Sequence, residues 1–260
     1  MSSNQSFAGK VVLVTGGAKG VGRGIAECYL AAGATVLVCG RNLPETPLPE
    51  AEGRSAVFHA CDVRDPEAVI ALFAQIMQAH GRLDVLVNNA GGTPFVKAAQ
   101  ASPKFHESII RLNLLAPLQM AQQANDIMQK QAEGGVIVFI GSIGASRPQP
   151  GTAAYGAAKA GILSLTQSLA VEWAPHVRVV SVSPGYVNTE QSIQHYGDEA
   201  GIAAVAKTIA LQRMATPADI GNACVFVSSP QAAYVSGTDL LVHGGGERPA
   251  FLDAANVNKD

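Results

Sequence analysis

The chain has 260 residues, with 20 acidic and 18 basic side chains and a formal net charge of −2. This length fits one α/β domain spanning 1–260, and the slightly acidic balance excludes a broad basic surface for nucleic acid. Residues 1–10 contain no apolar core and polar residues interrupt the uncharged segment 220–238, so neither a secretory signal nor a membrane span is expected.

The first element is a short strand that leads through a glycine-rich turn into a helix. Residues 10–15 are mostly β-branched, residues 15–22 read TGGAKGVG, and apolar residues at helical spacing predict a helix over 21–32. A glycine-rich turn of this kind is often only a tight loop. Between a strand and a helix, however, its N–H groups and the positive helix end favour a dinucleotide pyrophosphate.

The rest of the chain alternates strands and helices. Further strands are predicted near 35–39, 55–60, 83–88, 135–140, 177–183 and 239–242. Helices are predicted near 66–80, 103–132, 153–174 and 217–228. Pro44, Pro47 and Pro49 predict that 41–54 is a loop with at most one helical turn. The alternation predicts a doubly wound, seven-stranded parallel sheet of the Rossmann type, with ligands at the carboxyl ends of its strands.

Cysteines and histidines give no sign of a metal site. No paired-ligand spacing occurs among them, so no metal is expected at a catalytic site. The cysteines also lack a secreted disulfide framework, and we expect free thiols in a reducing cytoplasm. They are Cys28, Cys39, Cys61 and Cys224.

The pentapeptide Y-G-A-A-K places Tyr155 and Lys159 four residues apart, on one face of the predicted 153–174 helix. A lysine cation about 4 Å from the phenol contributes roughly 4 kcal/mol at an effective dielectric of about 20. That would lower the tyrosine pKa from about 10 to about 7, where general acid–base chemistry works best. The same spacing also occurs on solvated helix faces, so the pair alone decides nothing.

Several motifs in one order resemble the short-chain dehydrogenase/reductase family, in its shorter type, over about residues 8–247. They are TGGAKGVG (15–22), CDV (61–63), NNAG (88–91), Asn113 in RLNLL, Ser142 in IGSIG, Tyr155 with Lys159, PGYVNT (184–189) and a late glycine cluster after Val242. The resemblance implies that the protein is an enzyme, an oxidoreductase that interconverts a secondary alcohol and a ketone.

The resemblance assigns four catalytic residues. Tyr155 would exchange the proton, and Lys159 would bind the nicotinamide ribose and lower the tyrosine pKa. Ser142 would hydrogen-bond the substrate oxygen. Asn113 would hold a water that passes the proton from Lys159 to solvent. Read without the resemblance, Ser142 is also a common turn residue and Asn113 could be a buried amide.

The same resemblance assigns the cofactor-binding residues. They are Gly16, Lys19, Gly20, Val21, Gly22, Arg41, Asp62, Val63, Asn89, Ala90, Gly91, Tyr155, Lys159, Pro184, Gly185, Val187 and Thr189. Gly40 stands where NAD-binding relatives carry an acid, and Arg41 and Lys19 suit a 2′-phosphate. NADP(H) is therefore favoured, although both bases could simply be exposed and NAD(H) is the alternative.

Alternatives remain for the function. The enoyl reductase branch spaces its tyrosine and lysine further apart, and the epimerase branch is longer. A non-catalytic NADP(H) sensor would be expected to have lost one of the four catalytic residues. The segment 190–212 is expected to be a mobile loop that lines the substrate pocket, and its largely apolar composition favours a ring, steroid-like or acyl substrate.

Assembly follows from the predicted 153–174 helix, whose small residues allow another helix to approach closely. We expect a homotetramer, with a dimer as second choice. The tail 247–260, which contains Pro249, Phe251 and Leu252, could reach a neighbouring subunit. The small residues could instead let the helix lie close to its own sheet.

Overall fold

Continuous apolar runs form the strands of a parallel sheet in the computed structural model, which describes residues 6–256. The sheet has seven strands in the order β5-β2-β1-β6-β7-β8-β9, and every neighbouring pair is parallel. These strands are β1 (Val11–Thr15), β2 (Thr35–Gly40), β5 (Val57–Ala60), β6 (Val85–Asn88), β7 (Gly135–Ile140), β8 (Val177–Pro184) and β9 (Asp239–Val242). The predicted Rossmann-type sheet is thereby confirmed.

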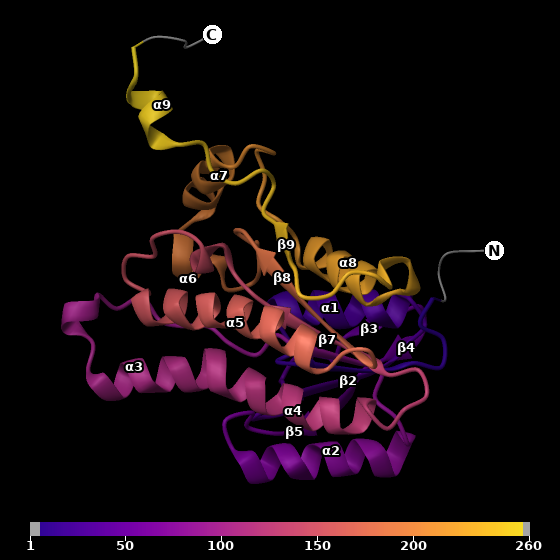
Figure 1. Ribbon diagram of the computed structural model, residues 1–260. Helices are drawn as coiled ribbons and strands as arrows, with labels where there is room; N and C mark the ends of the chain where they lie inside the picture. Colours follow the sequence, from indigo (N-terminus) through magenta and orange to yellow (C-terminus); the bar gives the residue numbers. More distant parts are fainter. Residues whose placement is uncertain (1–5, 257–260) are drawn as a thin grey trace.

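Helices cover both faces of the sheet (Figure 1). The helices are α1 (Gly20–Ala31), α2 (Pro66–His80), α3 (Pro103–Ile110), α4 (Ala116–Met128), α5 (Ala153–Glu172), α6 (Ser192–Tyr196), α7 (Glu199–Thr208), α8 (Pro217–Ser228) and α9 (Ala250–Ala254). One buried cluster joins α2, α4 and α5 to one face of the sheet. A second cluster joins α1 and α8 to the other face.

The strand order reverses between β1 and β6, because the chain crosses from β5 at the sheet edge back to the far side of β1. The carboxyl ends of β1 and β6 therefore lead their loops in opposite directions, which opens a crevice above the sheet. The glycine-rich turn after β1 and the NNAG turn after β6 both lie at this point.

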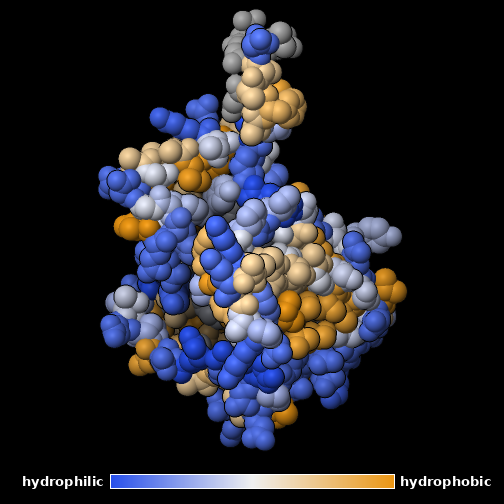
Figure 2. Space-filling view, turned by 90° about the vertical axis from the view of Figure 1, so that its left-hand side faces the viewer, coloured by the Kyte–Doolittle hydropathy of each residue, from blue (hydrophilic) through white to orange (hydrophobic). Residues whose placement is uncertain are grey.

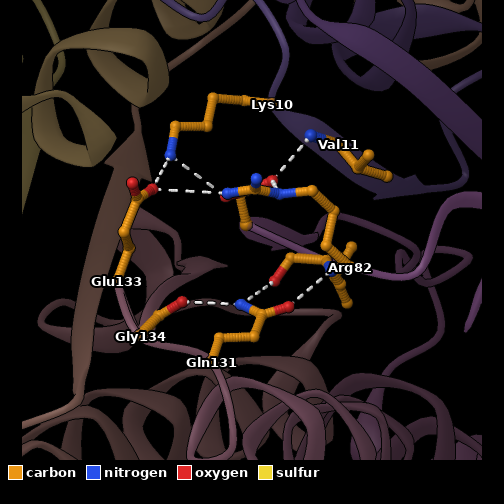
Figure 3. Close-up of polar contacts among 8 residues, drawn as sticks. Lys10, Val11, Arg82, Gln131, Glu133 and Gly134 are labelled. Atoms are coloured by element: carbon orange, nitrogen blue, oxygen red, sulfur yellow. Dashed lines mark hydrogen bonds and ion pairs between the residues drawn. The ribbon is translucent and has the colours of Figure 1, made fainter.

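The opposite, amino ends of the strands are joined by a polar cluster around Asp84 (Figure 3). The Asp84 carboxylate accepts hydrogen bonds from the Val11 N–H at 2.8 Å and from the Arg82 guanidinium at 2.6 and 2.9 Å. Lys10 contacts it at 3.3 Å and also pairs with the exposed Glu133. The cluster ties the start of β1 to the start of β6.

Three sequence predictions of local structure are wrong. The helix predicted over 103–132 is interrupted by a π-helical segment, Arg111–Leu115, and ends at Met128. The stretch 41–54 contains no helix, as predicted, but it is not simply a loop, because it contains most of a two-stranded hairpin, β3 (Glu50–Ala51) and β4 (Arg54–Ser55). The substrate segment 190–212 is largely helical, since α6 and α7 lie within it.

The hairpin is held to the body through the proline-rich stretch before it. Arg23 on α1 donates to the carbonyl oxygens of Pro47 at 2.8 Å and of Leu48 at 3.4 Å.

All four cysteines are free thiols. Within residues 6–256, no helix combines the length and the apolar character that a membrane crossing requires.

Candidate active site

The turn after β1 is closely packed around its glycines. Gly16 and Gly20 have φ of 63° and 54°, in the left-handed region that favours glycine. A Cβ on Gly22 would lie 2.4 Å from both the Gly16 carbonyl oxygen and the Asn89 Nδ2 atom. The first turn of α1 carries no acidic residue, and its N-cap Lys19 makes no side-chain capping bond. This is the close-packed, positive helix end that a pyrophosphate requires.

Thr15 joins this turn to the NNAG turn. Its hydroxyl accepts hydrogen bonds from the N–H groups of Asn89 at 3.0 Å and Ala90 at 2.9 Å. The Asn89 side chain donates in return to the Thr15 carbonyl oxygen at 2.9 Å. Thr15 was not among the predicted site residues, although it is the first letter of the TGGAKGVG motif that pointed to the site.

An acidic residue lies at the start of α1. The Glu190 carboxylate, which directly follows Thr189 in the loop after β8, accepts a hydrogen bond from the Gly20 N–H at 2.9 Å. The sequence contains no signal for this contact, because the two residues are 170 positions apart.

The end of β2 carries exposed positive charge. Lys19 and Arg41 both have exposed side chains, and Gly40 has no acidic side chain to oppose them. A Cβ on Gly40 would meet only the ring of Phe58, at 3.6 Å. The structure thus leaves both bases accessible, Arg41 directly after β2 and Lys19 in the turn after β1.

Asp62, the predicted adenine contact, is paired with Arg64. The guanidinium contacts the carboxylate at 2.6 and 2.9 Å. The hydrogen bond from Arg64 is the main cause that lowers the Asp62 pKa to about 2, and the charge of Arg41 adds to it. The neighbouring Val63 is buried. Arg64 was missed by the sequence analysis, although it directly follows CDV.

Tyr155 and Lys159 lie on one face of α5, as predicted. The Lys159 Nζ atom lies 5.6 Å from the centre of the Tyr155 ring and donates to the Ile140 carbonyl oxygen at 2.7 Å. Lys159 is only 4 % exposed, and burial lowers its pKa to about 8. The lysine therefore sits under the tyrosine ring and bonds to the end of β7.

The predicted depression of the Tyr155 pKa is wrong for the protein alone. Burial raises the pKa of the phenol above its ordinary value, while a hydrogen bond with Ser142 acts in the opposite direction. The Lys159 ammonium group lies 5.6 Å from the centre of the ring and is itself buried. The helical spacing predicted that Tyr155 and Lys159 share one face of α5, but it did not predict the direction in which the Tyr155 pKa shifts.

Ser142 lies where β7 ends. Its hydroxyl accepts a hydrogen bond from the Gly144 N–H at 3.0 Å and so caps the short 3-10 helix Ile143–Ala145. The same hydroxyl bonds the Tyr155 phenol. The structure brings Ser142 and Tyr155 together at the carboxyl end of the sheet.

Asn113 occupies the middle of the π-helical segment and is completely buried. Its amide donates to the carbonyl oxygens of Ile109 at 2.9 Å and Gly92 at 3.0 Å, and its Oδ1 accepts from the Gly92 N–H at 2.8 Å. A Cβ on Gly91 would lie 2.7 Å from that Oδ1 and 3.7 Å from the Lys159 Nζ. Asn113 and Lys159 therefore converge beneath Gly91, at a π-helical segment of the kind often found at functional sites.

The loop after β8 carries the residues predicted to back the nicotinamide. Pro184 is buried, and a Cβ on Gly185 would lie 2.9 Å from the Cα of His243. Val187 forms a bridge with Ala215. The start of this loop is thus pinned against the segment after β9 and the segment before α8.

Thr189, predicted to bind the carboxamide, lies in the same loop. Its N–H donates to the Ser192 hydroxyl at 2.8 Å, and its own hydroxyl accepts from the Gln191 N–H at 3.2 Å. Ser192 is 2 % exposed. A buried serine therefore fixes the backbone of this loop beside α6.

The predicted apolar lining is exposed in part. Ile193 and Leu211, within 190–212, are both 66 % exposed. Arg147, Tyr186 and Glu247 instead form a polar group, described below. None of the sequence motifs pointed to Arg147 or Glu247.

Comparisons with known proteins match the chain to reductases and dehydrogenases. A family model described as enoyl-(acyl carrier protein) reductase matches residues 16–247. The chain is 34% identical over 256 residues to an L-fucose dehydrogenase of Oryctolagus cuniculus, covering 95% of this chain and 88% of that one. It is also 34% identical over 254 residues to a sorbose reductase of Schizosaccharomyces pombe, covering 94% and 98%.

Among solved structures, the fold is similar to a ligand-free aldohexose dehydrogenase of Thermoplasma acidophilum. The TM-score is 0.86 at 28% identity, and the match covers 100% of both chains.

Proposed function

From the premise that the chain belongs to the short-chain dehydrogenase/reductase family, we propose that it is an NADP(H)-dependent enzyme that interconverts a secondary alcohol and a ketone. The family consists of oxidoreductases that act on CH–OH groups with a nicotinamide cofactor. The observation that carries the proposal is the convergence of four groups. Tyr155 bonds Ser142 and overlies Lys159, and Lys159 meets Asn113 beneath Gly91.

In the proposed reaction Tyr155 is the general acid and base. Its raised pKa keeps the phenol protonated at neutral pH, so it can donate a proton to the carbonyl oxygen during reduction. A bound nicotinamide would supply or accept the hydride, and its oxidised ring would add positive charge near the phenol. Ser142 would hold the substrate oxygen through a hydrogen bond.

Lys159 and Asn113 complete the proposed proton path. Lys159 would bind the nicotinamide ribose hydroxyls from below Tyr155. Both N–H groups of the Asn113 amide are already used by Ile109 and Gly92. A relay water would therefore bond the remaining lone pair of the Asn113 Oδ1, on the side facing Lys159.

The remaining cofactor-binding residues would bind the pyrophosphate, the adenosine and the 2′-phosphate. The glycines of the first turn, with Val21, would receive the pyrophosphate. Asp62, Val63 and the 89–91 turn would hold the adenosine. Lys19 and Arg41 favour NADP(H) over NAD(H), because both are exposed and no acid stands at Gly40.

For the substrate we propose a sugar-type alcohol rather than the apolar ring, steroid-like or acyl compound that the sequence favoured. The relatives are named for L-fucose, sorbose and aldohexoses, and Ile193 and Leu211 face solvent. An enoyl reductase is not proposed, since only three residues separate Tyr155 from Lys159.

We also propose that the whole chain, 1–260, works as one dinucleotide-binding and catalytic domain in the cytoplasm, as a homotetramer or, second, as a dimer. Free thiols support the location. Exposed small residues on α5, which are Ala153, Ala157 and Ala160, support helix-to-helix assembly.

The test is turnover by the purified protein with NADPH, NADH and their oxidised forms, using sugars, alditols, cyclic alcohols and steroid ketones. We expect turnover with a clear preference for the phosphorylated cofactor. Equal kcat/KM for both cofactors would contradict the cofactor assignment. Binding of NADPH without turnover of any compound would favour the sensor alternative.

A further inference from the structure

Three side chains from separate parts of the chain form a polar group near the catalytic tyrosine. Arg147 precedes α5, Tyr186 follows β8, and Glu247 follows β9. The Arg147 guanidinium forms an ion pair with Glu247 and donates to the Tyr186 hydroxyl at 3.0 Å. The guanidinium carbon also lies 5.3 Å from the centre of the Tyr186 ring. We refer to these three residues as the Arg147 group.

The Arg147 group lies at the carboxyl end of the sheet, as Ser142 does. Arg147 follows the short helix that Ser142 caps, and Tyr186 and Glu247 follow β8 and β9. The rings of Tyr186 and Tyr196 meet edge to face, with their centres 5.8 Å apart. The pKa of Tyr196 is raised first by burial and then by Tyr186 and Tyr155, whereas Arg147 lowers it. Tyr196 therefore packs against the Arg147 group through the ring of Tyr186.

The charges of the group limit what it can bind. Burial alone would raise the pKa of Glu247, but hydrogen bonds with Arg147 and Tyr186 lower it, so the carboxylate stays ionised at neutral pH. The Arg147 charge is thereby already neutralised. A carboxylate or phosphate on the substrate would meet Glu247 as well as Arg147, which removes the advantage of an anion.

The unused hydrogen-bonding capacity points to hydroxyl groups. The Arg147 and Glu247 side chains are 30 % and 24 % exposed, so a substrate can reach part of the guanidinium and of the carboxylate. A hydroxyl can accept from a guanidinium and donate to a carboxylate, so adjacent hydroxyls match an Arg–Glu pair. The rings of Tyr186 and Tyr196 add apolar surface for the carbon skeleton. An apolar ring would cover the exposed parts of Arg147 and Glu247 without hydrogen-bonding them.

We propose that Arg147, Glu247 and Tyr186 form a specificity site that binds hydroxyl groups of a neutral polyhydroxylated substrate, away from the carbon that reacts. This inference rests on the proposed function and adds to it the residues that select the substrate class.

The experiment compares two kinds of alcohol in the NADP⁺-dependent direction. Polyhydroxylated probes are D-glucose, L-fucose and sorbitol, and cyclohexanol is the probe without further hydroxyls. In Arg147→Ala, the ratio of kcat/KM for the best polyol to that for cyclohexanol should fall by about 100-fold, because buried polar groups lose their partners. Glu247→Gln, which keeps the shape, should lower the same ratio.

A matched control is Arg213→Ala. Arg213 forms an equivalent pair with Asp219, in the first turn of α8, at 2.7 Å, but Arg213 is 55 % exposed and precedes the helix. The ratio should not change in this variant. Arg147→Lys, which restores the charge without the fork, should recover part of the ratio.

The outcomes separate the two proposals. Oxidation of cyclohexanol but of no polyol by the wild-type protein overturns the specificity site and the sugar-type substrate, and leaves standing the proposed NADP(H)-dependent interconversion of a secondary alcohol and a ketone. Equal losses on both kinds of alcohol in Arg147→Ala and Glu247→Gln also overturn it, because a purely structural role affects both. Absence of any turnover despite NADP(H) binding overturns the proposed function and this inference with it.

Discussion

The Glu190 carboxylate caps the start of α1 through the Gly20 N–H, at 2.9 Å. This is the helix end at which the proposed pyrophosphate would bind, and two anions cannot use the same N–H group. Glu190 directly follows Thr189, so cofactor binding would displace the start of the segment that carries α6 and α7. The contact joins the turn after β1 to the loop after β8.

Replacement of Glu190 tests this link. In Glu190→Gln the competing charge is removed, and the affinity for NADPH should rise by roughly two- to tenfold. Fluorescence titration of NADPH measures the change. Glu199→Gln, an exposed acid in the first turn of α7, is the control and should leave the affinity unaltered. Unchanged or weaker binding in Glu190→Gln would show that the carboxylate does not compete.

Tyr155→Phe should remove catalysis and leave cofactor binding nearly intact. The ring and its packing over Lys159 remain, but the transferable proton is lost, so kcat should fall by about 10² or more. Steady-state kinetics and NADPH titration give the two readouts. Tyr234→Phe, on a fully exposed ring, serves as the control. More than about a tenth of wild-type activity in Tyr155→Phe would rule out the assigned role.

Arg41→Ala should weaken NADP(H) binding selectively. Loss of a charge-assisted hydrogen bond to the 2′-phosphate should cost about 1.5–3 kcal/mol. Binding of NAD(H), which lacks this phosphate, is the internal control and should barely change. Calorimetric titration with both cofactors measures the difference. A similar loss for both would mean that Arg41 supports the fold of the 41–54 stretch instead.

Asp84→Asn should lower the free energy of unfolding without changing the candidate active site. The hydrogen bonds from Arg82 and Val11 and the charge of Lys10 outweigh burial and lower the Asp84 pKa. The charged carboxylate therefore contributes stability above its unfolded pKa of about 3.9, which is lost as the pH falls through the lower folded pKa. At neutral pH the substitution should cost about 1.5–3 kcal/mol of unfolding free energy, measured with urea.

The control for Asp84→Asn is a second acidic residue of the same polar cluster. Glu133 has a side chain that is 66 % exposed, so Glu133→Gln should change the stability far less than Asp84→Asn. Equal effects would show that the contribution comes from the surface charges rather than from the buried carboxylate. If the unfolding free energy of Asp84→Asn falls at low pH as steeply as that of the wild-type protein, another group controls acid unfolding.

Assembly is tested by light scattering at micromolar concentration. A homotetramer should give about four times the 26.8 kDa of one chain. The α9 segment projects from the body as an apolar extension with Phe251 70 % exposed, which favours a neighbouring subunit as its contact (Figures 1 and 2). Val171, on α5, is 81 % exposed, and Val171→Asp should lower the mass. A monomeric wild-type protein would reject both the tetramer and the dimer.

The sequence by itself determined the order of the strands along the chain, the position of the glycine-rich turn and the shared face of Tyr155 and Lys159. These follow from local rules, since an apolar run, a turn residue or an i, i+4 spacing acts within a few residues. The parallel sheet also followed, because strands separated by helices have few other ways to bury both faces.

Only the tertiary structure decided the features that depend on distant partners. The π-helical segment at Asn113 forms where a side chain from one helix bonds the Gly92 backbone. The direction of the Tyr155 pKa shift depends on burial, which no sequence spacing measures. The pairs Glu190 with Gly20 and Arg147 with Glu247 join residues 170 and 100 positions apart. Such contacts form only because the sheet brings the loops after β1, β7, β8 and β9 to one edge, where charges meet that lie far apart along the chain.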